Sequence, residues 1–239
     1  AGEGEGGAGE GEGEGATSGG EGEGGVAVAD AARDPVAYGI ALAVAEAHVA
    51  AAKDAYAAGK KDAAAEMFAH PVSEVLLEMD PVFTKLGVAD VKPLFSAASD
   101  AALAGKSAAE VNAAHDRIIA GLGAAAQKAP NSGATPAKVA TGVIADMIER
   151  ASAMYRSLAR EEGYEPYLDG YGFSRVAASR FAASGAAIKA ENPEAHARIS
   201  EALALLAKAY PTATRPAKLP VEAGALSGAS AKVMLAAGS

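Results

Sequence analysis

The chain has 239 residues, of which 50% are hydrophobic, 21% are charged and 5% are aromatic, and it contains no cysteine and no tryptophan. Its length and apolar content allow one large core or two small ones, which excludes a wholly disordered protein. The lack of cysteine excludes disulfides, thiolate catalysis and cysteine zinc sites. Because much of the apolar content is alanine, we expect an interior of closely spaced helices.

The formal net charge of −9 is concentrated at the start of the chain, where residues 1 to 25 hold seven glutamates and no basic residue. The other acidic residues nearly balance the 21 lysines and arginines, which are scattered along the sequence. A nearly neutral folded part without a basic patch argues against a nucleic acid partner.

Residues 1 to 25 consist almost entirely of glycine and glutamate, which bury nothing and repel one another, so we predict a flexible acidic tether. An acidic tail that collects cations or a partner is the alternative. A start at Ala1 rather than methionine is expected of a periplasmic or otherwise exported protein whose signal peptide has been removed, although an artificial chain end would look the same. The tether could hold such a protein at a membrane. No uninterrupted apolar run approaches 18 residues, so we expect no transmembrane segment.

After residue 25 the apolar residues recur with the 3.6-residue period of a helix, and strand-like alternation is missing, so the fold is predicted to be all-α. The first helix is expected to begin at Asp34–Pro35, a cap residue followed by proline, and to end at Gly59. A second helical stretch, about 60 to 86, is expected to be broken or kinked at His70–Pro71 and at Asp80–Pro81.

Two further helices complete a first antiparallel bundle, which we predict over residues 26 to 129. One of them is expected from about Asp90 to Ala104. The other begins at a capping box, in which Ser107 and Glu110 satisfy each other's backbone amides.

Residues 127 to 136 are rich in proline, glycine, asparagine and serine, and they predict the boundary to a second helical bundle over residues 130 to 210. The helices of this second bundle are expected to begin at Thr135–Pro136, near residue 166 and at Asn192–Pro193. Residues 211 to 239 are predicted to be a proline-rich extension with a short helix near residues 226 to 237.

Two helical segments resemble each other. Residues 114 to 122 (AHDRIIAGL) and 195 to 203 (AHARISEAL) agree at five of nine positions. This agreement predicts that the two bundles arose by internal duplication and enclose a groove. Alanine-rich helices also match by chance, so both explanations stay open.

Four residues are candidate metal ligands: His48, His70, Glu74 and Glu78. His70 and Glu74 are four residues apart and can share a helix face, with His48 on the neighbouring antiparallel helix and Glu78 one turn further along. Imidazole and carboxylate groups suit iron, copper or zinc, and iron or copper is the cofactor we expect. The alternative is that His70 and Glu74 point to solvent at the start of a packed helix.

Other polar residues are candidates for binding a ligand. His115 and His196 fall on the apolar sides of their helices at matching places in the repeat, and a buried histidine needs a polar partner. They are either core histidines bonded to a carbonyl or tyrosine, or a polar pair flanking a cleft.

Tyr164, Tyr167 and Tyr171 have helical spacing. In a cleft they could stack on sugars, donate hydrogen bonds or bind ferric iron, and core packing is the alternative. The chain lacks an H-E-x-x-H motif, a phosphate-binding glycine loop and a G-x-S-x-G elbow, so we do not expect an enzyme.

The stretch YLDGYGFSRVA resembles the Y-x-D-x-x-G-F helix of imelysin-like proteins, the family that includes the EfeO-type periplasmic iron-uptake component. Tyr167, Asp169, Gly172 and Phe173 carry this likeness, and residues 51 to 83 are similar in rhythm to the family's first helical hairpin. The resemblance implies two duplicated four-helix bundles, export, binding of iron, haem or an anionic polysaccharide, and Asp169 as a binding residue. The family's H-x-x-E element is absent, because the spacing from His70 to Glu74 is one residue longer.

Together these features predict an exported, non-enzymatic protein that holds a metal ion, haem or a small polar ligand in a cleft between helices. The alternative is a non-catalytic accessory or structural subunit that docks onto a larger, membrane-associated assembly and binds no ligand. A cleft that gathers the histidines, Glu74 or the tyrosines would favour the first hypothesis, and an exposed apolar stripe would favour the second.

Overall fold

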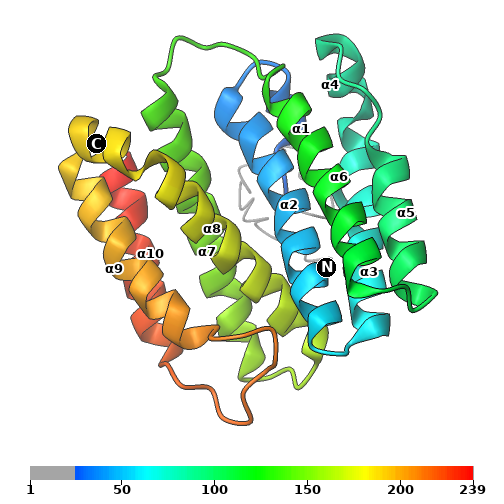
Figure 1. The fold of residues 1–239 in the computed structure, drawn as a ribbon. Helices are drawn as coiled ribbons and strands as arrows, with labels where there is room; N and C mark the ends of the chain where they lie inside the picture. The colour runs from blue at the N-terminus through cyan, green and yellow to red at the C-terminus, as the bar shows by residue number, and fades with distance from the viewer. Residues whose placement is uncertain (1–24, 239) are drawn as a thin grey trace, which may run out of the picture.

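The computed structural model describes residues 25 to 238, and the chain is all-α over this range, with no β-strand among these residues (Figure 1). The predicted fold class is therefore confirmed. The predicted acidic tether lies almost wholly outside the described residues.

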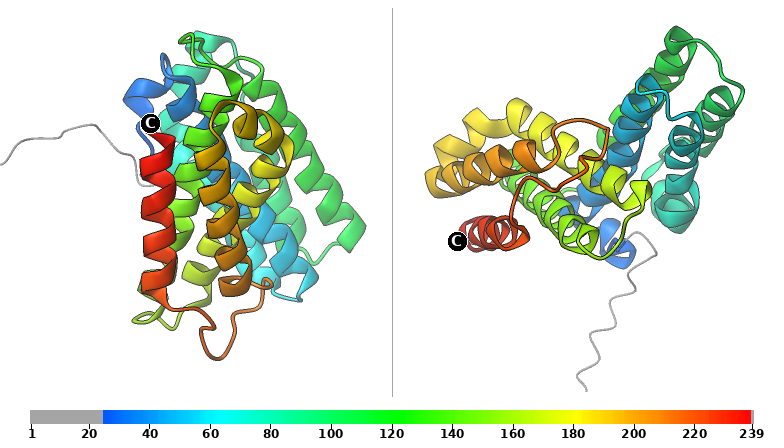
Figure 2. Two further views of the ribbon diagram at one scale, coloured as in Figure 1. Left: turned by 90° about the vertical axis from the view of Figure 1, so that its left-hand side faces the viewer. Right: turned by 90° about the horizontal axis from the view of Figure 1, so that it is seen from below.

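The helices before the predicted boundary are α1 (Val28–Ala31), α2 (Pro35–Ala57), α3 (Lys61–Pro71), the π-helical segment η1 (Val72–Leu76), α4 (Leu77–Leu86), α5 (Lys92–Leu103) and α6 (Ala108–Ala126). Those after it are α7 (Pro136–Leu158), α8 (Tyr164–Glu191), α9 (Pro193–Ala209) and α10 (Ala223–Ala237). Viewed from below, α2 to α6 and α7 to α10 form two neighbouring groups (Figure 2, right). The two antiparallel bundles and their internal duplication stay predictions.

Helix α2 connects the two groups, since it packs against α3 and α6 on one side and against α7 and α8 on the other. Helix α10 packs against α7 and α9 and is part of the second group (Figure 2, left). The extension predicted for residues 211 to 239 thus begins as an irregular connection and ends in a 15-residue helix that contributes to the core.

The helix starts predicted at Asp34, Ser107, Thr135 and Asn192 are confirmed, and each has a side-chain cap. The Asp34 side chain accepts a hydrogen bond from the Val36 amide, with Pro35 at the first helical position. Ser107 and Glu110 form the expected capping box. The first amides of a helix have no hydrogen-bond partner within the helix, and these side chains accept from them. A short polar residue followed by proline, or followed three residues later by glutamate, therefore marks where a helix begins.

The stretch from Lys61 to Leu86 remains helical through both prolines, so it is not broken at His70–Pro71 or at Asp80–Pro81, and the kink given as the other possibility stays a prediction. Pro71 has no amide hydrogen to donate to the preceding turn, and the chain continues directly after it in the wider π-helical segment η1. At Pro81 the α-helix also continues.

Helices α2 and α8 approach each other very closely at Gly172. A Cβ atom added to Gly172 would lie 2.2 Å from the Ala47 carbonyl oxygen, so no side chain fits there. Ala47 and Ala51 of α2 are fully buried beneath this contact. Small residues on both helices therefore bring the neighbouring side chains of α2 and α8 within reach of one another.

Among residues 25 to 238, α2 is the one helix long and apolar enough to cross a membrane, and 72% of its most apolar window is buried inside the fold. A core helix of a soluble protein has the same properties, so this feature is weak evidence of a membrane span. The expected lack of a transmembrane segment stays a prediction.

Candidate metal centre

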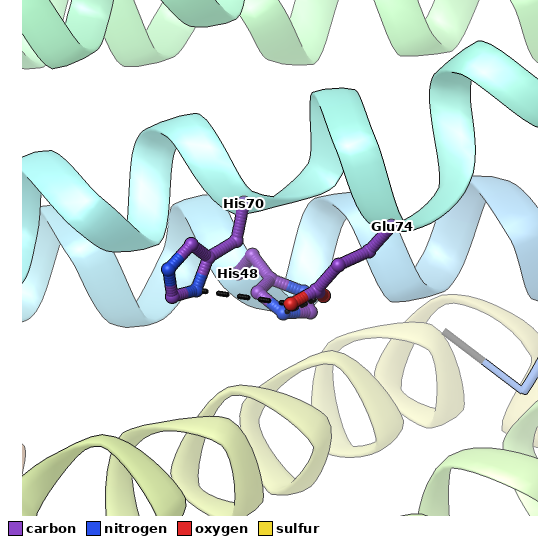
Figure 3. Close-up of side chains that lie close together, drawn as sticks. All are labelled: His48, His70 and Glu74. Atoms are coloured by element: carbon purple, nitrogen blue, oxygen red, sulfur yellow. Dashed lines mark ion pairs between the residues drawn. The ribbon is translucent and has the colours of Figure 1, made fainter. Parts of the chain in front are cut away.

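Four titratable side chains from four elements converge beside the α2–α8 contact: His48 of α2, His70 of α3, Glu74 of η1 and Asp169 of α8. The His48 Nε2 atom lies 3.1 Å from Glu74 Oε2 and 3.6 Å from Asp169 Oδ1. The His70 Nδ1 atom lies 3.9 Å from Glu74 Oε1. Figure 3 shows both imidazole rings and the Glu74 carboxylate directed toward one another. One donor atom from each of these three residues falls within 4.8 Å of the others.

The π-helical segment presents Glu74 to this cluster. His70 ends the regular turns of α3, Pro71 follows, and Glu74 lies in the middle of η1. Its carboxylate reaches the buried ring of His48, while His70 stays on the same side of the stretch. The expectation that His70 and Glu74 face solvent is thereby corrected, because both are half-buried and face α2. Single π turns inside helices are frequent at functional sites.

The ring of His48 is oriented by its own helix. Its Nδ1 atom lies 2.8 Å from the Val44 carbonyl oxygen, which can only accept, so Nδ1 carries a hydrogen. In a neutral ring, Nε2 would then present a lone pair to the carboxylate oxygens of Glu74 and Asp169. Three acceptors that face one another are stable only with a proton or another cation between them.

The pKa values of the cluster follow from this geometry. Burial opposes a charge on His48, but the hydrogen bond to Glu74 and the charge of Asp169 outweigh it and raise the pKa of the imidazole. Burial also opposes the charge on Glu74, yet the His48 hydrogen bond and the nearby imidazoles lower the pKa of this carboxyl group. For Asp169 burial dominates and raises the pKa to about 6.

Asp169 and His70 each have a buried polar atom without a hydrogen-bond partner among the described residues, Oδ1 of Asp169 and Nδ1 of His70. Asp169 lines a cavity of about 330 Å³ together with the apolar side chains of Val44, Met154 and Phe173 and the charged side chain of Arg150.

A second, more exposed group adjoins the first. Glu66 of α3 and Glu165 of α8 lie on the outer side of His70, and one donor atom from each of the three falls within 4.8 Å of the others. The His70 Nδ1 atom lies 3.4 Å from Glu165 Oε1. Both glutamates are exposed, so His70 stands between the solvent-facing carboxylates and the buried cluster.

Three of the predicted binding residues lie away from the cluster. Glu78 is one turn beyond Glu74 and exposed on α4, so it is not part of either group. His115 pairs with Asp116 on α6, at 3.0 Å. His196 packs against the Phe181 ring, with 4.9 Å between centroids. The expected pairing of the two histidines across a cleft is not seen, because each makes its contacts locally.

The predicted tyrosines have structural partners. Tyr164 and Tyr167 donate hydrogen bonds to the carbonyls of Ala213 and Thr212, at 2.5 and 2.6 Å. Tyr171 donates to the Asp54 carboxylate at 2.7 Å. Tyr164 and Tyr167 therefore attach the connection before α10 to α8, and their hydroxyl hydrogens are already used. Core packing, the alternative to ligand binding, describes these tyrosines better.

Sequence reasoning missed Glu66 and Glu165. A signal was present, because Glu66 and His70 are four residues apart on α3, and Glu165 and Asp169 are four apart on α8. The sequence does not reveal the rotation of α8 about its axis. This rotation decides that Glu165 and Asp169 face α3 and α2.

The chain matches no protein-family model, no curated protein and no solved structure. Fold and site together define an all-α protein with a half-buried cluster of two histidines and two carboxylates at the junction of two helix groups.

Proposed function

We propose that the protein binds a transition-metal cation through His48 Nε2, Glu74 and Asp169, with His70 as a further ligand. The observation that carries this proposal is the hydrogen bond from His48 Nδ1 to the Val44 carbonyl. It leaves Nε2 as the metal-binding nitrogen, and a backbone partner on the opposite ring nitrogen is a usual feature of metal-bound histidines.

The distances suit a metal ion. Two ligands that are each about 2.1 Å from one ion lie roughly 3 to 3.5 Å apart, depending on the angle between them. The separations from His48 Nε2 to Glu74 and Asp169 are 3.1 and 3.6 Å. Imidazole and carboxylate donors together suit iron, zinc and copper, and the set contains no thiolate that would favour a softer ion.

The role we propose is binding rather than catalysis, in an exported protein. The likeness of the Tyr167 to Phe173 stretch to imelysin-like proteins supports both parts, since that family is periplasmic and includes an iron-uptake component. The 330 Å³ cavity beside Asp169 is consistent with an ion and a few waters or a small polar ligand.

The test is calorimetric titration of the metal-free protein with ferrous, ferric, cupric and zinc ions. His48→Ala and Glu74→Gln should each weaken binding of the preferred ion by about 100-fold or more, since each removes a direct ligand. His115→Ala and His196→Ala are matched controls, because these rings contact Asp116 and Phe181 instead, and binding should be unchanged.

Equal binding by the parent and the two cluster variants would overturn the proposed site. Failure of all four ions to bind would instead favour the alternative function, an accessory subunit that carries no ligand. Elemental analysis of protein purified from its source identifies the natural ion.

A further inference from the structure

A second cavity shares no lining residue with the cavity beside the histidine cluster. It has a volume of about 700 Å³ and runs between the first half of α2, the connection from α6 to α7, and the first half of α7. It reaches Arg180 of α8, which is about three helical turns from Asp169. The volume is in the range of cavities that enclose small organic molecules, about 300 to 1,000 Å³.

The walls of this cavity are mainly apolar. Leu42 of α2, Pro130 of the connection, and Val139 and Ala140 of α7 contribute to them. Among the described residues that line it, Arg180 is the one with a charged side chain. An apolar channel with a single cationic group favours a ligand that is apolar along its length and anionic at one end.

The Arg180 side chain is held by an ion pair, and its Nε donor has no hydrogen-bond partner within residues 25 to 238. Its Nη2 group donates a hydrogen bond of 2.8 Å to Glu46 Oε2, which fixes the plane of the guanidinium. The Nε atom is buried. A buried donor without an acceptor destabilises a protein, so an acceptor atom delivered by a ligand removes this cost.

We propose that this cavity binds a medium-chain aliphatic carboxylate, with its hydrocarbon chain along Leu42, Val139 and Ala140 and its carboxylate on Arg180. A carboxylate fits better than a neutral head group, because a hydrogen bond between a guanidinium and a carboxylate is charge-assisted. Glu46 accepts a hydrogen bond from Nη2 alone, so the guanidinium keeps further donors for the ligand. This site is independent of the proposed metal centre and does not require an ion.

The test uses decanoate as the probe, with decan-1-ol as the probe of equal chain length that lacks the charge. By calorimetry on the full chain, decanoate should bind at least tenfold more tightly than decan-1-ol. Arg180→Met should weaken decanoate binding by roughly tenfold or more, the loss expected for a charge-assisted hydrogen bond, and leave decan-1-ol unchanged. Ala140→Trp fills the channel and should abolish binding of both probes.

Arg175→Met is the matched control, because Arg175 lies on the same helix but is exposed and outside this cavity, and it should bind decanoate as the parent does. Since Arg180→Met leaves Glu46 without its partner, Glu46→Gln/Arg180→Met keeps the charge balanced if the single variant does not fold. Failure of decanoate to bind the parent chain, or binding that neither Arg180→Met nor Ala140→Trp weakens, would overturn the proposal. So would equal affinities for decanoate and decan-1-ol.

Discussion

At the scale of single residues, Asp169 makes the stability of the metal-free protein depend on pH. Its pKa is raised from 3.8 to about 6, mainly by burial. The folded protein therefore holds this proton more tightly than the unfolded chain does. The resulting stabilisation is fully present below the unfolded pKa and is lost as the pH rises through about 6.

Asp169→Asn should remove this dependence. Relative to the variant, the parent should lose free energy of unfolding between pH 4 and pH 7, by at most about 3 kcal/mol for a shift of this size. Urea unfolding in the presence of a chelator measures the difference, and parallel pH profiles for the two proteins would contradict it. Glu74→Gln should give the opposite sign, because the pKa of Glu74 is lowered and its stabilisation is lost as the pH falls.

The candidate ligands were predictable from sequence to the extent that they share one helix. His70 and Glu74 were found by their spacing, and His48 by the expected antiparallel neighbour. Asp169 came from the resemblance alone. Glu165 was missed because its role depends on how α8 is turned toward α3, and this is fixed by packing at Gly172 rather than by local pattern.

At the scale of helices, the π-helical segment η1 controls the metal centre. Pro71→Ala restores the missing amide hydrogen and allows a regular α-helix through residues 72 to 76. We expect Glu74 to turn away from His48, so metal affinity should fall while the melting temperature is maintained or rises. Calorimetric titration and thermal unfolding of the same variant measure the two effects.

Pro81→Ala is the matched control, because Pro81 lies in a stretch that is already α-helical and is exposed. Its metal affinity should equal that of the parent. If Pro71→Ala also binds metal as the parent does, the π segment has no part in presenting Glu74.

The close contact between α2 and α8 gives a second prediction for helices. Gly172→Ala places a methyl group against the Ala47 carbonyl, which α2 cannot move without shifting the adjacent His48. We expect a loss of about 1 to 3 kcal/mol in the free energy of unfolding, together with weaker metal binding. Gly185→Ala on the same helix meets only the Phe181 ring, at 3.6 Å or more, and should be neutral or stabilising by up to about 1 kcal/mol.

Helix starts were predictable because caps are local, as at Asp34 and Ser107. The effect of Pro71 on the helix was not predictable from the sequence. A proline inside a helix can end the helix, bend it or widen it, and the packing of neighbouring helices decides between these outcomes. The final helix was expected near residues 226 to 237 and spans Ala223–Ala237, whereas its packing against α7 and α9 left no local signal.

At the scale of the whole molecule, the metal centre lies where the two groups of helices meet. His48 and Glu74 belong to the group of α2 to α6, whereas Asp169 belongs to the group of α7 to α10. An ion bound by all three connects the groups directly. Their arrangement could not be read from the sequence, because residues in contact such as His48 and Asp169 are more than a hundred positions apart.

Metal binding should therefore stabilise the entire fold and not one group alone. With the preferred ion at about 100 times its Kd, the free energy of unfolding should rise by about 2.7 kcal/mol. In a chain of this size this corresponds to an increase in Tm of roughly 5 to 10 °C. Calorimetric scans of the full chain, with and without the ion, measure the increase in Tm for each unfolding transition.

The decisive comparison is the double variant Glu74→Gln/Asp169→Asn, which removes one carboxylate from each group of helices and retains both histidines. Its Tm should no longer respond to the ion, and magnesium, which prefers oxygen ligands and retains its waters, should not shift the Tm of the parent. If the ion raises the Tm of the double variant as much as that of the parent, it binds elsewhere. If the protein unfolds in two separate transitions and the ion raises the Tm of only one, the ion does not connect the two groups of helices. A ligand bound by both groups must oppose the unfolding of each group.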